Sequence, residues 1–183
     1  MADAKFGTPY SLPPATADQL GGVKVGDYLD IAPDGTLSGK TLNDKIAAAV
    51  AAINASQRPV MLVGGGVINA DAEYDAMHLC EKLRIPVVST LMGLGAISAY
   101  RSLFLGMTGL HGHERANNAV KEADLILAVG SRFNDRVTGE RSSYSANKTV
   151  IHLDIDPAEL DKNIYSSIGI LSLIHISEPT RPY

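Results

Sequence analysis

The run LILAV, from Leu125 to Val129, has the pattern of a β-strand that is buried on both faces. Five consecutive apolar residues between Asp124 and Gly130 are typical of an interior strand of a parallel sheet, because neither face of such a strand meets water. The segment after this run, SRFNDR, is polar and carries two arginines and an aspartate. Ligands of open α/β sheets bind outside the carboxyl ends of the strands, where guanidinium groups pair well with phosphate. The pattern therefore predicts a phosphate-bearing ligand at this end of the strand.

Helix and strand patterns alternate from Thr41 onward, which predicts an α/β fold with a parallel, doubly wound sheet and helices on both of its faces. The first helix is indicated by apolar residues that recur on one helical face between Leu42 and Ile53. A last helix is expected to open at Pro157, with Asp156 as its cap. The other expected elements are strands at 59–63, 86–90, 125–129 and 149–155 and helices near 70–83 and 113–122.

The composition excludes several classes of function. The 183 residues carry a formal net charge of -4, and basic residues form no stripe, so nucleic acid is not an expected partner. Cys80 is the only cysteine, so no disulfide can form within one chain. The amino-terminal segment lacks a signal-peptide pattern, and no apolar run approaches the roughly 18 residues of a membrane span. A cytoplasmic location without membrane contact is the resulting expectation.

Three segments of different composition predict the domain organisation. Residues 1–40 are rich in Gly, Pro, Thr and Asp, and they are expected to form a leader that is flexible or holds one short hairpin with a turn at Asp34 and Gly35. This leader weakly resembles phage tail-fibre proteins and is unrelated to the rest of the chain. Residues 41–170 form the expected globular domain. Residues 171–183, LSLIHISEPTRPY, resemble the translation of a sequencing adapter and are expected to be an artefactual or disordered tail.

Three glycines, Gly64, Gly65 and Gly66, directly follow the strand expected at 59–63. Glycine lets the backbone approach a ligand closely and offers amide groups to a phosphate or ribose, but the run could equally serve a tight strand-to-helix turn. A nicotinamide dinucleotide site is not expected. Asn69 stands where its fingerprint has a third glycine, and the next strand ends without an acidic residue.

Three further places at the expected carboxyl edge of the sheet carry polar groups. Thr90, Leu91 and Met92 offer a hydroxyl and an adaptable apolar surface to a flat ring, although Leu91 and Met92 could instead cap the core. His111 is interpreted as a loop donor to a ligand; no metal site is expected, because no third ligand has a suitable spacing. Asp154 can accept hydrogen bonds from a ribose or an amide, or it can help to cap the helix expected after it.

Five segments together resemble the central domain of acetolactate synthase (acetohydroxyacid synthase) catalytic subunits: QRPVMLVGGGVI, KLRIPVVSTLMGLGA, LGMTGLHGHERANNAV, EADLILAVGSRFNDRVTG and IHLDIDPAELDKNI. They occur in the order and spacing of that family across residues 41–170. The resemblance implies a six-stranded, Rossmann-like parallel domain that binds FAD as a structural cofactor. The family condenses pyruvate with a second 2-ketoacid by means of thiamine diphosphate, in branched-chain amino acid biosynthesis.

The resemblance also implies site residues, none of them catalytic. Arg136 matches the family arginine that recognises the carboxylate of the second 2-ketoacid, which suits a bidentate guanidinium group; the alternative is a salt bridge to Asp135 or to another neighbour. Leu110 stands where the family commonly has a methionine that lines the substrate pocket, so the pocket shape departs from the family here. The residues that match flavin-contacting motifs are Gly64, Gly65, Gly66, Thr90, Leu91, Met92, His111, Gly130, Arg132, Asp135, Arg136, Val137 and Asp154.

The resemblance implies further parts that this sequence lacks. The activating glutamate and the magnesium motif of the family lie in flanking domains that bind thiamine diphosphate, so the chain is expected to be a truncated domain that is inactive alone. The tail from Leu171 is expected to replace the last strand. The parent protein would form a catalytic homodimer and bind a small regulatory subunit. The alternatives are the central domain of another thiamine diphosphate enzyme such as a pyruvate oxidase, a non-catalytic nucleotide-binding module, or a surface structural protein.

Overall fold

The computed structural model describes residues 19–20, 23–24, 30–31, 37–38 and 42–171. The chain divides into two units, Met1–Asp44 and Lys45–Tyr183. The expected turn at Asp34 and Gly35 lies outside the described residues, and the boundaries of the leader stay a prediction. The first unit contains two antiparallel pairs of short strands, β1 (Gln19–Leu20) with β2 (Val23–Lys24) and β3 (Asp30–Ile31) with β4 (Leu37–Ser38).

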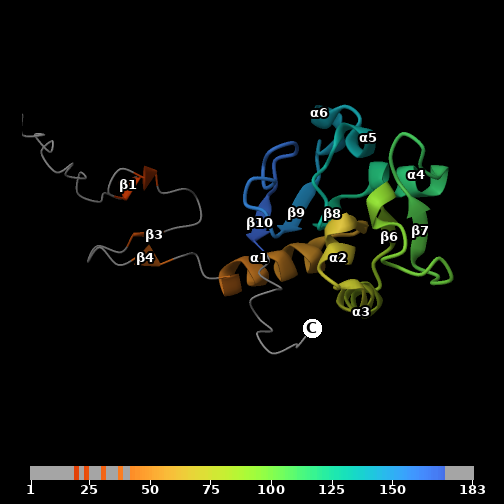
Figure 1. The fold of residues 1–183 in the computed structure, drawn as a ribbon, viewed down its shortest axis with the longest axis horizontal. Coiled ribbons are helices and arrows are strands. Elements are labelled where there is room, and N and C mark those ends of the chain that lie inside the picture. Colours follow the sequence, from red (N-terminus) through yellow and green to blue (C-terminus); the bar gives the residue numbers. More distant parts are fainter. Residues whose placement is uncertain (1–18, 21–22, 25–29, 32–36, 39–41, 172–183) are drawn as a thin grey trace, which may run out of the picture. The chain divides into compact units, whose positions relative to one another are not determined.

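A parallel sheet of six strands organises the second unit (Figure 1). The elements from Leu42 onward are α1 (Leu42–Ala55), β5 (Pro59–Val63), α2 (Gly65–Asn69), α3 (Glu73–Leu83), β6 (Val87–Ser89), η1 (Leu91–Gly93), β7 (Phe104–Met107), α4 (Glu114–Glu122), β8 (Leu125–Val129), α5 (Asp135–Thr138), α6 (Arg141–Tyr144), β9 (Thr149–Asp154) and β10 (Ile168–Leu171). From one edge to the other the strand order is β7, β6, β5, β8, β9, β10, and every neighbouring pair is parallel. Counted from β5, this is the strand order of the Rossmann fold.

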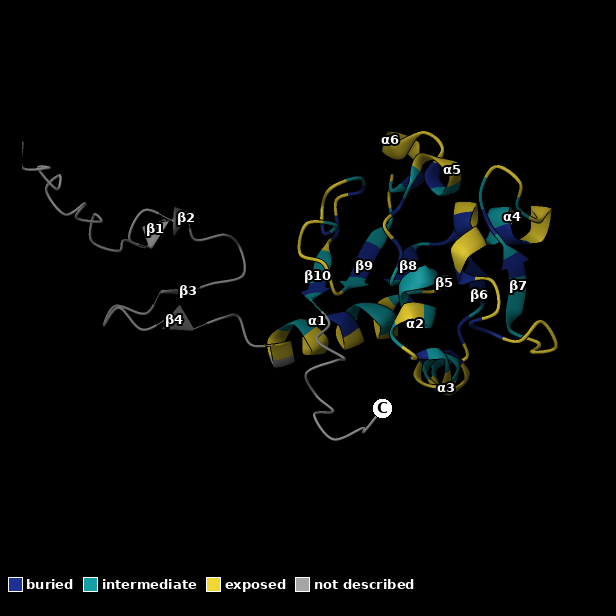
Figure 2. Cartoon of the chain, viewed as in Figure 1, coloured by how far each residue is buried: buried dark blue, intermediate teal, exposed yellow. Residues whose placement is uncertain are grey.

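Alternate residues of the strands face two separate hydrophobic cores, so the sheet is buried on both sides (Figure 2). On β5, Met61 and Val63 pack with α1, α2 and α3, whereas Val60 and Leu62 pack with α4 and α6. None of these four side chains is more than 3% exposed. The predicted α/β fold, with a parallel sheet and helices on both faces, is confirmed.

The strands expected from apolar runs are present as β5, β6, β8 and β9, and the helices expected near 70–83 and 113–122 correspond to α3 and α4. The helix expected from Pro157 is wrong. Asp156 does accept a hydrogen bond from the Ala158 amide at 2.8 Å, but the segment forms turns. Asp161 has a φ of 60°, which a right-handed helix does not contain, and its carboxylate accepts the Ser166 amide. The capping residue Asp156 therefore begins a turn that does not continue into a helix.

The strand β10 contradicts the expectation that the tail replaces the last strand of the domain. Ile168, Gly169 and Ile170 pair in parallel with β9, and Ile170 is 6% exposed in the same core as α1. The sheet therefore has the six strands that the resemblance implied, with Leu171 as the last residue of β10. Residues 172–183, the rest of the expected tail, lie outside the described residues.

Asp124 joins the loops that lead into three neighbouring strands. Its carboxylate accepts hydrogen bonds from the Ser56 hydroxyl, from the Gln57 amide at 2.8 Å and from the Arg58 amide at 3.0 Å. Its main-chain carbonyl accepts the Thr149 amide at 2.9 Å. The hydrogen bonds, above all the one from Ser56, hold the pKa of this carboxyl below its ordinary value of 3.8.

Replacing Asp124 with asparagine is expected to lower the free energy of unfolding by about 1 kcal/mol at neutral pH, because a charged acceptor is lost from a partly exposed site. Since the pKa is lower in the folded state, the contribution of the carboxylate is present above pH 3.8 and is lost as the pH falls below it. Urea unfolding at about pH 7 and about pH 3 measures both effects. The difference between wild type and Asp124→Asn should shrink in acid; a constant difference would contradict this role of the carboxylate.

Candidate functional site

The crevice of this fold lies where the connections diverge on either side of β5. The chain runs from β5 to β6 and β7 on one side, and it then returns to place β8, β9 and β10 on the other. In open α/β sheets the loops separate at such a switch point and leave room for a ligand at the carboxyl ends of the strands. Every site residue expected from the sequence lies at the carboxyl end of β9 or in the segment, loop or short helix, that follows β5, β6, β7 or β8.

The glycines at the switch point allow two loops to pack backbone against backbone. The Gly64 amide donates to the Val129 carbonyl at 2.9 Å, and the Gly66 amide donates to the Gly130 carbonyl at 3.0 Å. A Cβ at Gly64 would lie 2.1 Å from the Gly130 oxygen, and Gly130 itself has a φ of 59°. Gly64 and Gly66 thus serve the turn. The Gly65 amide, at the first position of α2, makes no hydrogen bond within the described part of the chain and can donate to a ligand.

A cavity of about 140 Å³ opens beside these glycines. The ends of β8 and β9 and the helix α2 line it, and Gly66, Gly130 and Asp154 are among its residues. Asp154 Oδ1 accepts the Asp156 amide at 3.0 Å, so it holds a turn and not the expected helix. Asp154 Oδ2 lies 3.7 Å from His152 Nε2, too far for a hydrogen bond. This second oxygen keeps its capacity to accept a hydrogen bond from a ligand.

The loop after β6 forms the 3-10 helix η1 and presents apolar side chains at the rim. Thr90 Oγ1 accepts the Gly93 amide at 3.1 Å and thereby caps this turn. Leu91 and Met92 are 67% and 72% exposed, so they do not cap the core. A Cβ at Gly65 would lie 2.9 Å from Met92 Cβ, which places Met92 against the glycine loop. The two side chains offer an apolar surface next to the switch point.

One buried aromatic side chain anchors the loop after β8. Phe133 is 1% exposed, and its ring packs edge-on against His152 with a centroid distance of 4.9 Å. Arg132 and Arg136 are exposed, and neither forms an ion pair with a described residue. The salt bridge between Arg136 and Asp135, the alternative from the sequence, is absent; Asp135 Oδ1 accepts the Arg136 amide at 3.0 Å instead. Both guanidinium groups are therefore available to an anion.

A second cavity, of about 590 Å³, lies between α4 and the segment that contains α5 and α6. Leu110 and Arg136 line it, and the Leu110 amide donates to the Arg136 carbonyl at 2.9 Å. Lys121 and Lys148 line it as well. Burial lowers the pKa of Lys148, whose Nζ donates to the Tyr144 carbonyl at 3.0 Å. The sequence does not predict these two lysines, because no local pattern marks residues so far apart as neighbours.

Two asparagines that the sequence does not single out fix the loops of the larger cavity. Asn117 Oδ1 accepts the Thr108 hydroxyl and the Gly109 amide, both at 2.8 Å, and its Nδ2 donates to the Gly109 carbonyl at 3.0 Å. Asn134 Oδ1 accepts the Val137 amide at 3.1 Å and caps α5. The preference of asparagine for helix N-caps could have identified Asn134. No sequence signal identifies Asn117, whose partners depend on the packing of α4 against the loop after β7.

The expected site residues share one edge of the sheet, but neither of these two cavities holds all of them. Among them, the residues that line the smaller cavity are Gly66, Gly130 and Asp154. Those that line the larger cavity are Leu110, Asp135, Arg136 and Val137. Neither cavity is lined by the remaining expected residues, which are Gly64, Gly65, Thr90, Leu91, Met92, His111 and Arg132.

The two histidines after β7 do not converge. Both are exposed, and the ring of His113 covers Gly106, where a Cβ would lie 2.4 Å from His113 Cδ2. Among the described residues, no group of three or more His, Cys, Asp and Glu side chains could hold a metal ion. In the same part of the chain, no helix combines the length and the apolar character needed to span a membrane.

The strand order, the crevice at the switch point and the polar loops around it place the chain in the class of doubly wound α/β domains. Residues 46–176 match the family described as "Thiamine pyrophosphate enzyme, central domain". The chain belongs to this family. The matched range includes the first residues of the expected tail, so the domain boundary near residue 171 stays a prediction.

The relatives agree with the expected resemblance to acetolactate synthase catalytic subunits, which is confirmed. The acetolactate synthase large subunit of Cyanidium caldarium is 46% identical over 121 residues, which cover 66% of this chain and 21% of that protein. The large subunit of Parasynechococcus marenigrum is 40% identical over 157 residues, 82% of this chain and 25% of the relative. That of Haemophilus influenzae is 42% identical over 127 residues, 69% of this chain and 22% of the relative. The chain thus spans between a fifth and a quarter of the length of these relatives.

Proposed function

We propose that this chain supplies the FAD-binding central domain, and part of the substrate site, of an acetolactate synthase catalytic subunit. The family and the identity of 40% to 46% with such subunits support the parent activity. The parent reaction is the decarboxylation of pyruvate and its condensation with a second 2-ketoacid. Thiamine diphosphate and magnesium are assigned to other parts of such a polypeptide, and the chain by itself is not expected to form acetolactate.

The cavity at the switch point, bordered by the backbone of Gly66 and Gly130 and by Asp154, carries the assignment of FAD. Here a bare backbone borders a cavity, and a Cβ at Gly66 would lie 2.8 Å from Gly130 Cα. Asp154 is assigned as the acceptor for ribose hydroxyls, and Arg132 as the partner of the phosphates, since guanidinium pairs bidentately with phosphate. The exposed Leu91 suits an apolar ring. When bound, FAD would supply the planar flavin ring and a pyrophosphate. Its proposed role is structural.

The size of the smaller cavity limits how a dinucleotide is held. Ligand pockets commonly enclose about 300–1,000 Å³, and this cavity has about 140 Å³. Only part of FAD fits inside it. The remainder is expected on the rim, where Leu91 and Met92 are more than half exposed.

The larger cavity is assigned to the substrate. Arg136 is free of ion pairs with described residues and lines this cavity, which supports recognition of the carboxylate of the second 2-ketoacid. Leu110, where the family commonly has methionine, is 72% exposed beside it and is expected to change the substrate preference. A homodimer and a small regulatory subunit, which the family resemblance implies, and a cytoplasmic location, which is the expectation from the sequence, complete the proposal.

Titration of the purified chain with FAD, NAD and ADP, followed by calorimetry, tests the proposed cofactor. The chain is expected to bind FAD more tightly than the other two, because ADP has no second ring and the nicotinamide ring of NAD covers less of the apolar rim than the three-ring isoalloxazine of FAD. Equal affinity for ADP and FAD would favour a simple nucleotide-binding module. Absence of binding by all three would contradict the proposal.

Replacing Arg132 with glutamine is expected to weaken FAD binding by about tenfold or more, because one charge-assisted contact to phosphate is lost. Arg141→Gln is the matched control: Arg141 is also exposed, but it lies on α6 and not in the segment that directly follows β8. The control should bind FAD like the wild type. Equal losses in the two variants would show that only the overall charge matters and would remove Arg132 from the site.

A further inference from the structure

His152 is a buried histidine without a hydrogen-bonding partner. It lies on β9, it is 0% exposed, and neither ring nitrogen makes a hydrogen bond within the described part of the chain. Its ring packs against the edge of Phe133. A phenylalanine or leucine would fill such a position without leaving two polar atoms unpaired, and unpaired buried polar groups in folded proteins are uncommon. The fold alone therefore does not account for a histidine here.

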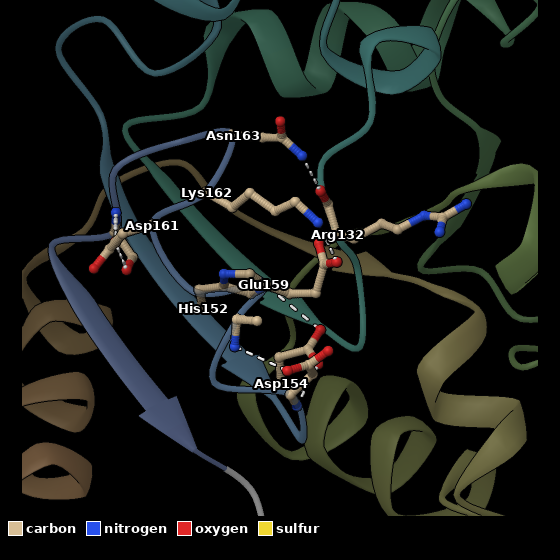
Figure 3. Close-up of polar contacts among 10 residues, drawn as sticks. Arg132, His152, Asp154, Glu159, Asp161, Lys162 and Asn163 are labelled. Atoms are coloured by element: carbon tan, nitrogen blue, oxygen red, sulfur yellow. Dashed lines mark hydrogen bonds and ion pairs between the residues drawn. The ribbon is translucent and has the colours of Figure 1, made fainter.

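The groups around His152 are mostly acidic, and Figure 3 shows them on two segments of the chain. Asp154 Oδ2, two residues along β9, lies 3.7 Å from His152 Nε2. Glu159 and Asp161 lie on the connection to β10 and act on the ring through their charge. Lys162 Nζ is the cation of this connection, and it donates to Glu159 Oε1 at 2.7 Å.

The loop after β8 covers the ring from another side. It contributes the Phe133 ring and the Ser131 backbone, which favours the protonated ring although neither ring nitrogen reaches it in ordinary hydrogen-bond geometry. The Arg132 side chain extends away from the histidine (Figure 3). Burial lowers the pKa of His152 from its ordinary value of 6.5, against the opposing effect of Asp154. The ring is therefore neutral at neutral pH and becomes a cation only in acid.

We propose that His152 is a positioning residue whose protonation decides whether Asp154 Oδ2 is available to the nucleotide. With a neutral ring, Oδ2 has no hydrogen bond to the histidine and can accept one from a ribose hydroxyl. With a protonated ring, the buried cation needs a counter-ion, and Asp154 Oδ2 is the nearest carboxylate oxygen. The oxygen that closes this ion pair is the one that the ligand needs. The inference rests on the proposed function, in which Asp154 contacts the bound nucleotide.

The direction of the pH effect follows from this competition. Binding of the nucleotide requires a neutral His152, so a proton leaves the ring when the ligand binds in acid. The affinity is then constant at neutral pH and falls below the pKa of His152, by at most tenfold for each pH unit because one proton is involved. The change lies below pH 6.5, since burial moves the pKa downward.

The dissociation constant of FAD, measured from about pH 8 to about pH 5.5, tests the proposal in the wild type and in His152→Gln. Glutamine is polar, of similar length and neutral over this range. The wild type should lose affinity in acid, and His152→Gln should not. The variant is essential because His111 is a second histidine, exposed at the same rim. A loss of affinity that persists in His152→Gln, or a wild type that binds FAD equally at every pH, would overturn the inference.

Nuclear magnetic resonance titration of the His152 ring without ligand gives a second readout that does not depend on FAD. In Asp154→Asn the ring should titrate at a lower pH than in the wild type, because the carboxylate that favours the cation is gone. An unchanged titration would overturn the pairing of His152 with Asp154. If FAD binds at no pH, the proposed function fails, and this titration still decides whether the two side chains are coupled.

Discussion

Replacing Phe133 with alanine is expected to lower the free energy of unfolding by about 3–5 kcal/mol, the usual cost of removing a buried phenylalanine side chain. Phe133 is 1% exposed, and its ring contacts two other rings, those of His152 and Tyr144, at centroid distances of 4.9 and 6.0 Å. The residue lies directly after Arg132 in the loop that follows β8. Its loss is therefore expected to release this loop as well and to weaken FAD binding. Urea unfolding and FAD titration of the same variant measure the two effects.

Two further variants show whether the effect of Phe133 comes from packing. Phe133→Leu keeps most of the volume and should cost less than about 1.5 kcal/mol. Tyr100→Ala removes an aromatic ring that is 99% exposed and should leave the stability within about 0.5 kcal/mol of the wild type. A cost for Phe133→Ala that is no larger than that of Tyr100→Ala would contradict the anchoring role of Phe133.

Replacing Gly64 with alanine is expected to destabilise the fold by about 3 kcal/mol, because the new Cβ collides with backbone that cannot move independently. It would lie 2.1 Å from the Gly130 oxygen and 2.7 Å from Ser131 Cα. The φ of Gly64 is -104°, so the cost arises from the collision and not from backbone strain. The loops after β5 and β8 would separate, and the cavity beside them would change shape. Chemical unfolding measures the stability, and FAD titration reports on the cavity.

The neighbouring glycine provides the matched control. In Gly65→Ala the new Cβ meets Met92 Cβ at 2.9 Å and the Met92 carbonyl oxygen at 3.2 Å, a milder overlap than at Gly64, which a small shift of the exposed η1 turn relieves. Alanine also favours helix over glycine by about 0.8–1 kcal/mol, and Gly65 is the first residue of α2. The stability of Gly65→Ala should thus stay within about 1 kcal/mol of the wild type. Similar losses in both variants would show that the close approach of the two loops does not set the cost.

The sequence predicts the strands whose side chains are buried on both faces, and it fails at the edges of the sheet. LILAV and PVMLV are continuous apolar runs and are found as β8 and β5. The edge strands β7 and β10 each contain a glycine, Gly106 and Gly169, that interrupts the apolar pattern. Gly106 has a φ of 103°, and the pairing of β6 with β7 shifts register beside it. An edge strand has one neighbour only, so its pattern is weaker and the position of the strand depends on that neighbour.

The position of the candidate site is also predictable, because the carboxyl ends of all parallel strands lie on the same side of the sheet, whatever the conformation of the loops. The division of the site residues between two cavities is not predictable. It depends on contacts between distant residues, such as the hydrogen bond from the Leu110 amide to the Arg136 carbonyl at 2.9 Å. The same holds for His152. Its place in an apolar strand favours burial, and Asp154 lies on the same strand face two residues further on. The approach of Glu159 and Phe133, in contrast, follows from the packing of the loops above the strand.

Nuclear magnetic resonance of the labelled chain with added FAD shows whether FAD binds where the loops after β5, β8 and β9 meet. We expect the amide signals of Gly66, Gly130 and Asp154 to shift, because these residues line the cavity at the switch point. The signals of Asp124 and Thr149, which lie at the amino-terminal ends of β8 and β9, should not shift. Shifts confined to the amino-terminal ends of the strands, or no shifts at a saturating concentration of FAD, would show that FAD does not bind at the switch point.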